Sequence, residues 1–171
     1  SNPTRYVRSP GGGDHYNVKP LPEGLKAALQ QAKVVWISTA SNNRCGIRLG
    51  EVNFAFGERA NLSCGGKRTI NGISTKPAEG QWLESVFLLE RDADGNFKAH
   101  AGSRPRGDKE TPFAVDPFIE RAPAIAPQEL DLASWNSVMV RLDGDDAIDD
   151  IRIATCEGMD HLPFPFDPDN P

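Results

Sequence analysis

The stretch SNNRCGIRLGEVNFAFG, residues 41–57, decides between two fold classes. Its apolar residues alternate with a period of two, which is typical of a β-strand with one buried face. The phase of this alternation changes at Gly50-Glu51, and a change of phase at a glycine indicates a bulge or a tight turn. The alternating residues are Ile47 and Leu49 before the change, and Val52, Phe54 and Phe56 after it.

A helix is the competing interpretation of the same residues. Cys45, Leu49, Val52 and Phe56 fall at i, i+4, i+7 and i+11, which places them on one helical face. Against it, Gly46 and Gly50 would each cost about 1 kcal/mol relative to alanine in a helix interior. The sequence therefore favours strands, with the helix as the alternative.

The two interpretations give Cys45 different chemistry. In the first turn of a helix, its thiolate would be stabilised by the helix dipole. Over about a dozen residues this stretch resembles the cysteine helix of bacterial peptidoglycan amidases. The resemblance implies a cysteine-dependent hydrolase in which Cys45 attacks and a histidine on a later strand acts as the base. His100 lies on an expected strand and is the candidate base, and Asp108 or Asp116 would orient it.

On a strand, Cys45 is instead expected to form a disulfide. The chain has three cysteines, so one pair would leave one free thiol. We expect Cys45 and Cys64 to bridge the ends of this region, which leaves Cys156 unpaired.

The rest of the chain predicts a mainly β fold. Sixteen glycines and fourteen prolines among 171 residues indicate many turns and little helix. We expect an antiparallel β-sandwich-like domain with one short N-terminal helix and long loops, and α+β is the alternative. The expected elements are a helix over 22–33, strands over 34–40 and 84–91, and a hairpin that joins 138–142 to 151–153 through the acidic turn at 143–146.

Three parts are expected along the chain. We expect an extended arm over residues 1–21 and a single globular domain over residues 22–160. A Pro-rich, acidic C-terminal tail is expected over residues 161–171. The chain starts without a methionine, so we expect that an export signal was removed and that the protein is secreted or periplasmic. There is no run of about 18 apolar residues, so no membrane insertion is expected.

Charge argues against a nucleic-acid partner. The net charge is −5, and nine acidic residues but only one basic residue lie from Asp143 to the end. A phosphate binder needs a concentrated positive face. No cofactor is expected, with calcium as the alternative, because oxygen-rich side chains at close spacing are typical of calcium loops. Its candidate ligands are Asp143, Asp145, Asp146 and Asp149, and a plain hairpin turn is the alternative.

Aromatic and basic residues suggest where a ligand would bind. Trp82 and Trp135 lie where loops meet strands and would stack on sugar rings or anchor a protein partner. Trp36 lies within the buried run 34–40 and is expected in the core. The long loop 103–133 carries a small basic cluster that would meet an acidic ligand, namely Arg104, Arg106 and Lys109.

The leading functional hypothesis is an extracytoplasmic, non-catalytic binding domain. It would present a protein or carbohydrate site on loops 66–83 and 103–133 of a β-rich scaffold. The cysteine-dependent hydrolase is the first alternative. A calcium-dependent sugar-binding domain that uses the acidic turn and Trp135 is the second.

Overall fold

Residues 41–57 form a two-stranded hairpin, which confirms the strand interpretation. In the computed structural model, β4 (Cys45–Leu49) and β5 (Val52–Phe56) pair antiparallel, and Leu49 lies opposite Val52. The two-residue turn between them has Gly50 at φ 58°, a conformation that glycine adopts at little cost. Because Leu49 and Val52 face each other across this turn, both apolar sets point into the core despite their opposite phase in the sequence.

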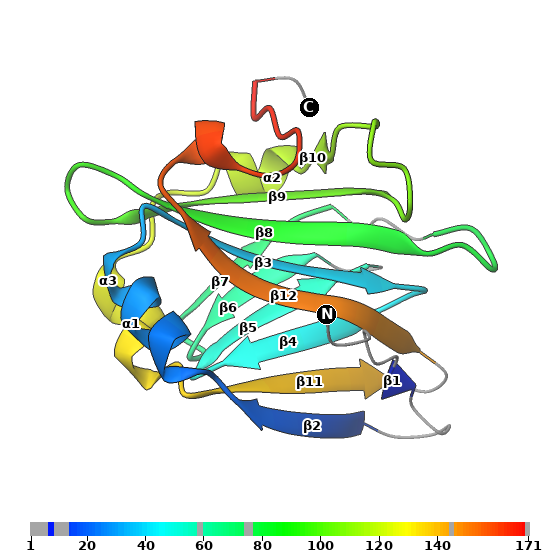
Figure 1. The fold of residues 1–171 in the computed structure, drawn as a ribbon, viewed down its shortest axis with the longest axis horizontal. Coiled ribbons are helices and arrows are strands. Elements are labelled where there is room, and N and C mark those ends of the chain that lie inside the picture. Colours follow the sequence, from blue (N-terminus) through cyan, green and yellow to red (C-terminus); the bar gives the residue numbers. More distant parts are fainter. Residues whose placement is uncertain (1–6, 9–13, 58–59, 74–76, 144–145, 170–171) are drawn as a thin grey trace.

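The structure describes residues 7–8, 14–57, 60–73, 77–143 and 146–169, with the backbone alone at 7–8, 14–17 and 143. Its strands form two six-stranded antiparallel sheets that pack face to face (Figure 1), so the predicted β-sandwich is confirmed. Sheet A has the order β1 (Val7–Arg8), β12 (Ala147–Cys156), β3 (Val34–Ser41), β8 (Leu83–Arg91), β9 (Phe97–Pro105), β10 (Ala114–Val115). Sheet B has the order β2 (Asp14–Pro20), β11 (Ser137–Asp143), β4, β5, β6 (Asn61–Cys64), β7 (Arg68–Asn71).

The helices are short and gather at the ends of the strands. The predicted N-terminal helix is confirmed as α1 (Glu23–Gln31), whose Leu29 is fully buried. Figure 1 shows α1 and α3 together at the left end of the sandwich. The remaining helices are α2 (Pro117–Glu120), α3 (Pro127–Leu130) and the 3-10 turns η1 (Leu132–Ser134) and η2 (Met159–His161).

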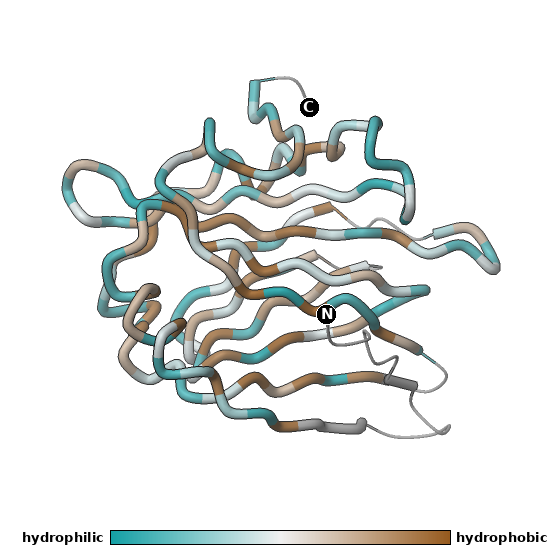
Figure 2. The backbone as a smooth tube through the Cα atoms, viewed as in Figure 1, coloured by the Kyte–Doolittle hydropathy of each residue, from teal (hydrophilic) through white to brown (hydrophobic). Residues whose placement is uncertain are grey.

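The main core fills the space between the sheets. Large apolar side chains from the inner faces of both sheets are completely or almost completely buried there, and Figure 2 shows the apolar residues recurring along the strands. Aromatic rings meet edge to face across the two sheets, as Phe54 of β5 and Phe87 of β8 do at 5.4 Å between centroids. The core residues with the largest side chains include Ile37, Ile47, Phe54, Phe56, Phe87, Leu89 and Trp135.

The expected hairpin between 138–142 and 151–153 is wrong. Strand β11 pairs with β2 and β4 in sheet B, whereas β12 pairs with β1 and β3 in sheet A. Alternation predicts that a segment is a strand with one buried face, but it does not choose the neighbour. Both strands bury apolar residues in the same core, Leu142 from one sheet and Ile148 from the other, so the chain crosses between the sheets here.

Part of the expected N-terminal arm belongs to the sandwich. Residues Asp14–Pro20 of the expected N-terminal arm form β2 at one edge of sheet B. Arg68–Asn71, at the start of the loop expected over 66–83, form β7 and pair with β6. Within the described residues, no helix is both long and apolar enough to cross a bilayer.

Candidate functional site

The outer face of sheet A, which points away from sheet B, carries an apolar centre. Along β3, Val35 and Ile37 enter the main core, so Trp36 and Ser38 point outward. Trp36 lies opposite Leu88 of β8, which also points outward. Such a face needs a cover, because apolar side chains exposed together would be costly to hydrate.

The cover is the C-terminal tail. The ring of Phe164 meets Trp36 edge to face at 5.2 Å and Phe113 at 5.2 Å between centroids. Phe166 lies against the His100 ring at 6.0 Å. In Figure 1 the tail crosses this side of the sheet near α2 and β10. A second, smaller apolar cluster therefore forms under it, made of Val34, Val86, Leu88 and Phe113 with Trp36, Cys156, Met159, Leu162, Phe164 and Phe166 packed around them.

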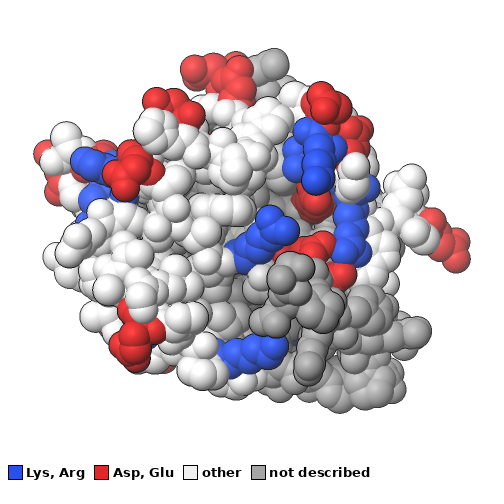
Figure 3. Space-filling view, in the orientation of Figure 1, with Lys and Arg blue, Asp and Glu red and all other residues white. Residues whose placement is uncertain are grey.

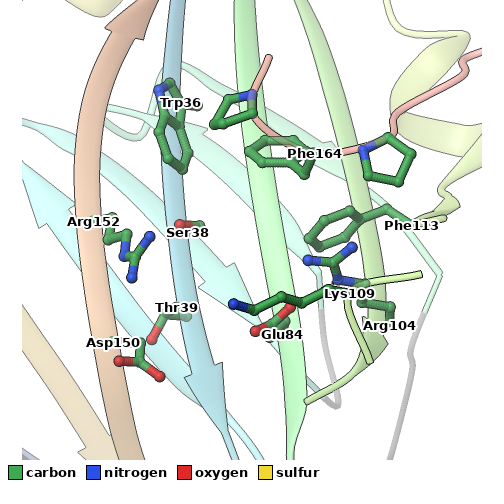
Figure 4. Close-up of a pocket in the computed structure, with 12 residues that line it drawn as sticks. Trp36, Ser38, Thr39, Glu84, Arg104, Lys109, Phe113, Asp150, Arg152 and Phe164 are labelled. Atoms are coloured by element: carbon green, nitrogen blue, oxygen red, sulfur yellow. Dashed lines mark hydrogen bonds and ion pairs between the residues drawn. The ribbon is translucent and has the colours of Figure 1, made fainter. Parts of the chain in front are cut away.

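A pocket of about 280 Å³ remains between the tail and the charged end of the same face. We call it the outer-face pocket. Trp36 and Phe164 lie at one end of it, and charged side chains surround the rest (Figure 4). Its lining includes Trp36 and Ser38 of β3, Glu84 of β8, Arg152 of β12, Lys109 of the loop after β9, and Phe164 of the tail.

Both carboxylates of the outer-face pocket are held by arginines. The Nε of Arg104 donates to Glu84 Oε2 at 2.8 Å, and the Arg104 guanidinium lies 4.3 Å from the centre of the Phe113 ring. Arg106 donates to Asp150 at 2.7 Å and to Asp149 at 2.6 Å. These contacts make Glu84 and Asp150 members of ion pairs.

A bulge in β12 aims the two aspartates at Arg106. The pairing of β12 with β3 shifts register between Asp149 and Arg152, and Asp150 adopts a left-handed conformation at φ 52°. Partial burial lowers the pKa of the Arg106 guanidinium, but the hydrogen bonds to Asp149 and Asp150 outweigh it and raise the pKa above its usual value. The bulge places both aspartates beside Arg106, and the ion pairs with Arg106 in turn stabilise the bulge.

Two cations of the pocket have no such partner. The side chains of Arg152 and Lys109 make no ion pair or hydrogen bond with any residue that the structure describes. Both line the pocket, and their charged ends extend toward its middle from opposite sides (Figure 4). The space-filling view shows basic and acidic side chains interspersed on the right-hand part of this face (Figure 3).

The loop that carries Lys109 is held in place. Asp108 accepts hydrogen bonds from the backbone N–H groups of Glu110 and Thr111 and from the Thr111 hydroxyl. The hydrogen bonds from Thr111 lower the pKa of the exposed Asp108 carboxyl. Arg104 Nη1 donates to the Thr111 carbonyl at 3.1 Å, which ties the loop back to β9. Asp108 therefore organises this loop and does not contact His100.

The structure does not bring the predicted catalytic residues together. Cys45 points from β4 into the core between the sheets, and burial raises the pKa of its thiol to about 12. His100 lies on the outer face of sheet A, because its neighbours Ala99 and Ala101 fill the core. A neutral thiol inside the sandwich and an imidazole on the far side of sheet A cannot form a nucleophile–base pair.

His100 has other partners. Its Nδ1 lies 2.6 Å from Glu120 Oε1 of α2, and its Nε2 lies 3.0 Å from Glu90 Oε1 of β8. The Phe166 ring covers one side of it. Through these contacts His100, which lies on β9, links β8, α2 and the tail.

The expected disulfide is absent, since Cys45 and Cys64 are both free thiols, as is Cys156. Strand β5 lies between β4 and β6, so the two cysteines are two strand spacings, about 10 Å, apart before any offset along the strands. Their offset is large, because Cys45 faces Phe56 at one end of β5 and Cys64 faces Val52 at the other. A disulfide needs Cα atoms within about 7 Å.

The four candidate calcium ligands do not come together as a metal site within the described residues. Asp145 and the side chain of Asp143 lie outside the described residues. Asp146 is buried and accepts a hydrogen bond from Asn43 Nδ2 at 2.9 Å, and Asp149 pairs with Arg106. The described part of the chain contains no cluster of three or more His, Cys, Asp or Glu side chains able to hold a metal ion.

The predicted binding residues separate into two groups. Trp135 is only 1% exposed, and its indole N–H donates to the Leu130 carbonyl, so its expected role as an exposed aromatic is wrong. Trp82 lies under the Arg106 guanidinium at 5.0 Å. Arg104 and Lys109 do line the outer-face pocket, and Arg106 supports it by holding Asp150.

Sequence reasoning missed Trp36, Arg152 and Phe164. Trp36 was expected in the core because it lies in an apolar run, but Val34, Trp36 and Ser38 share the face opposite to Val35 and Ile37. The alternation of tryptophan and serine with two core residues is the signal that could have found it. Arg152 and Phe164 reach the pocket only through the tertiary fold.

Neither the known protein-family models nor the sequences of curated proteins match this chain. Its function is therefore inferred from the geometry and chemistry of the outer-face pocket.

Proposed function

We propose that this protein is a saccharide-binding domain and that the ligand binds in the outer-face pocket. The observation that carries the proposal is the combination of Trp36 with polar side chains in one hollow of the sheet. A sugar ring has an apolar face that packs on an aromatic ring, and hydroxyl groups around its edge that need hydrogen bonds. Trp36 offers the aromatic surface for the apolar face of the ring. Hydrogen bonds to the hydroxyl groups would come from Ser38, Glu84 and Arg152.

The shape of the site supports a small ligand. The volume of about 280 Å³ is close to the lower end of the range for small-molecule pockets, which is about 300 Å³. A protein partner would more often meet a broad surface with buried aromatic anchors. The exposed aromatic Phe118 lies on α2, and it does not line this pocket. These points favour a saccharide over a protein ligand.

The ion pairs of the pocket support binding without catalysis. Glycoside hydrolysis uses two carboxyl groups, one to transfer a proton and one to act as nucleophile or base. Here Glu84 is held by Arg104, and Asp150 is held by Arg106. Both carboxylates are therefore engaged, and they orient the arginines that shape the pocket.

A titration of the purified protein with short oligosaccharides tests the proposal. Binding heats or the change in tryptophan fluorescence would report the affinity. Ser38→Tyr should fill the pocket and weaken binding at least tenfold, because Ser38 lies at its centre on β3. Thr69→Tyr is the matched control, since Thr69 is an exposed strand residue on β7 of the other sheet. The proposal fails if no saccharide binds, or if Ser38→Tyr binds as well as the control.

A further inference from the structure

We propose that the outer-face pocket selects an acidic saccharide, one that carries a carboxylate or a sulfate group. This inference rests on the proposed saccharide-binding function and names the chemistry of its ligand. The observation behind it is that two cationic side chains of the pocket, Arg152 and Lys109, have no anionic partner among the described residues.

The charges that line the pocket are unbalanced once their pairs are accounted for. Glu84 pairs with Arg104 at 2.8 Å, and Arg106 is shared between Asp150 at 2.7 Å and Asp149 at 2.6 Å. The charged groups that line the pocket, together with Arg106 and Asp149, therefore carry a net charge of +1. Arg152 and Lys109 make no ion pair with a described residue and are the source of this positive charge, in a chain whose net charge is −5. Two like charges that face one hollow repel each other, and an anion between them would remove this repulsion and gain two attractions.

Arg152 is placed to contact a ligand that packs on Trp36. It lies directly opposite Ser38 on the neighbouring strand, and Ser38 is two residues from Trp36 on the same face of β3. Diagonal neighbours on one face of a sheet are about 7–8 Å apart, which long side chains span. The guanidinium can therefore bond an acidic group on the edge of a ring that rests on the indole. Its planar fork can donate two parallel hydrogen bonds to one carboxylate.

Lys109 approaches from the opposite side on an ordered loop. Asp108 closes a turn through Glu110 and Thr111, and Arg104 anchors the Thr111 carbonyl. The position of the Lys109 backbone is thus fixed before a ligand arrives. The loop backbone therefore loses little conformational entropy when the Lys109 ammonium group meets the anion, which favours affinity.

A matched set of ligands separates charge from ring shape. We would titrate the full chain with trigalacturonic acid, with its methyl ester, and with a sulfated galactose trisaccharide of the same length. The free acid or the sulfated sugar should bind at least tenfold more tightly than the methyl ester, which keeps the ring but lacks the charge. The preference should shrink as salt is raised, because screening weakens both attractions.

Single substitutions at exposed positions test the residues. Arg152→Gln and Lys109→Gln should each remove most of the preference for the acidic sugar over the methyl ester, measured as the ratio of the two affinities. Arg152→Lys should retain part of it, and Lys67→Gln, an exposed lysine in the β6–β7 turn, should change nothing. Equal affinity for the acidic sugars and the methyl ester would overturn the inference and leave the saccharide function standing. Binding of none of them would overturn both.

Discussion

The ring of Phe164 in the C-terminal tail meets the indole of Trp36 on β3 edge to face, with centroids 5.2 Å apart. These two residues are far apart in the sequence, and their contact makes one wall of the outer-face pocket. The tail is therefore part of the site as well as a cover for the apolar outer face of sheet A. The stability of the tail and the shape of the pocket are expected to change together.

Phe164→Ala should lower the free energy of unfolding by about 2 kcal/mol. The side chain is half-buried, so the loss is smaller than that of a fully buried phenylalanine. Urea unfolding followed by far-UV circular dichroism measures it, and the tryptophan emission of the folded protein should move to longer wavelength as the Trp36 indole becomes wetter. Phe118→Ala is the control, because Phe118 is 51% exposed, and its effect should stay within about 0.5 kcal/mol.

Gly102→Ala should destabilise the protein by about 1–3 kcal/mol, because β9 has no room for a methyl group at this position. A Cβ there would lie 3.0 Å from the Ala114 carbonyl oxygen and 3.2 Å from the Phe166 ring. Gly24→Ala in α1 meets nothing within 4 Å and should leave stability unchanged or raise it by up to about 1 kcal/mol. Thermal unfolding of the two variants checks this difference of sign, and equal effects would contradict the close packing around Gly102.

Stability should fall above pH 9 in a way that depends on Cys45. Burial raises the pKa of this thiol to about 12 in the folded protein, against 9.0 for an ordinary cysteine. Between these values the unfolded chain loses the proton and the folded chain keeps it, so unfolding is favoured by about 1.4 kcal/mol per pH unit. Comparing the unfolding free energies of wild type and Cys45→Ala at pH 8 and pH 10.5 isolates this contribution. Parallel pH profiles for the two proteins would argue against a buried thiol.

Arg106→Gln should cost about 1 kcal/mol at low salt. It removes the cation that holds Asp149 and Asp150 beside each other in the β12 bulge, and the pairs are partly exposed, so solvent screens them. The loss should decrease between 0.05 and 0.5 M sodium chloride. Arg152→Gln serves as the comparison, since the Arg152 side chain has no ion pair among the described residues and its removal should not destabilise the fold.

Much of the fold could be predicted from local sequence. The alternation around Gly50 predicted the β4–β5 hairpin, and the helix expected over 22–33 is α1. Strand partners could not be predicted, because β11 and β12 have the same alternation as a hairpin yet lie in different sheets. The information that separates them lies in long-range packing of the core, which local periodicity does not contain.

The candidate site was predicted only in part, for the same reason. Arg104, Arg106 and Lys109 were identified as a basic cluster because they are neighbours in the sequence. Trp36 was assigned to the core, because an apolar strand residue does not reveal which face of its sheet is covered by another sheet and which by a tail. Cys45 was a candidate nucleophile in the helix interpretation, but it is a buried residue of the main core.

The most direct test of the account is a two-dimensional ¹H–¹⁵N spectrum of the protein during a titration with trigalacturonic acid. The chain has three tryptophans, so three indole N–H signals report on three places in the fold. The Trp36 signal, identified from Trp36→Phe, should shift progressively, because its ring lines the outer-face pocket. The Trp135 signal should stay fixed, since its N–H is bonded to Leu130 inside the core. An unchanged Trp36 signal at saturating ligand would contradict the account.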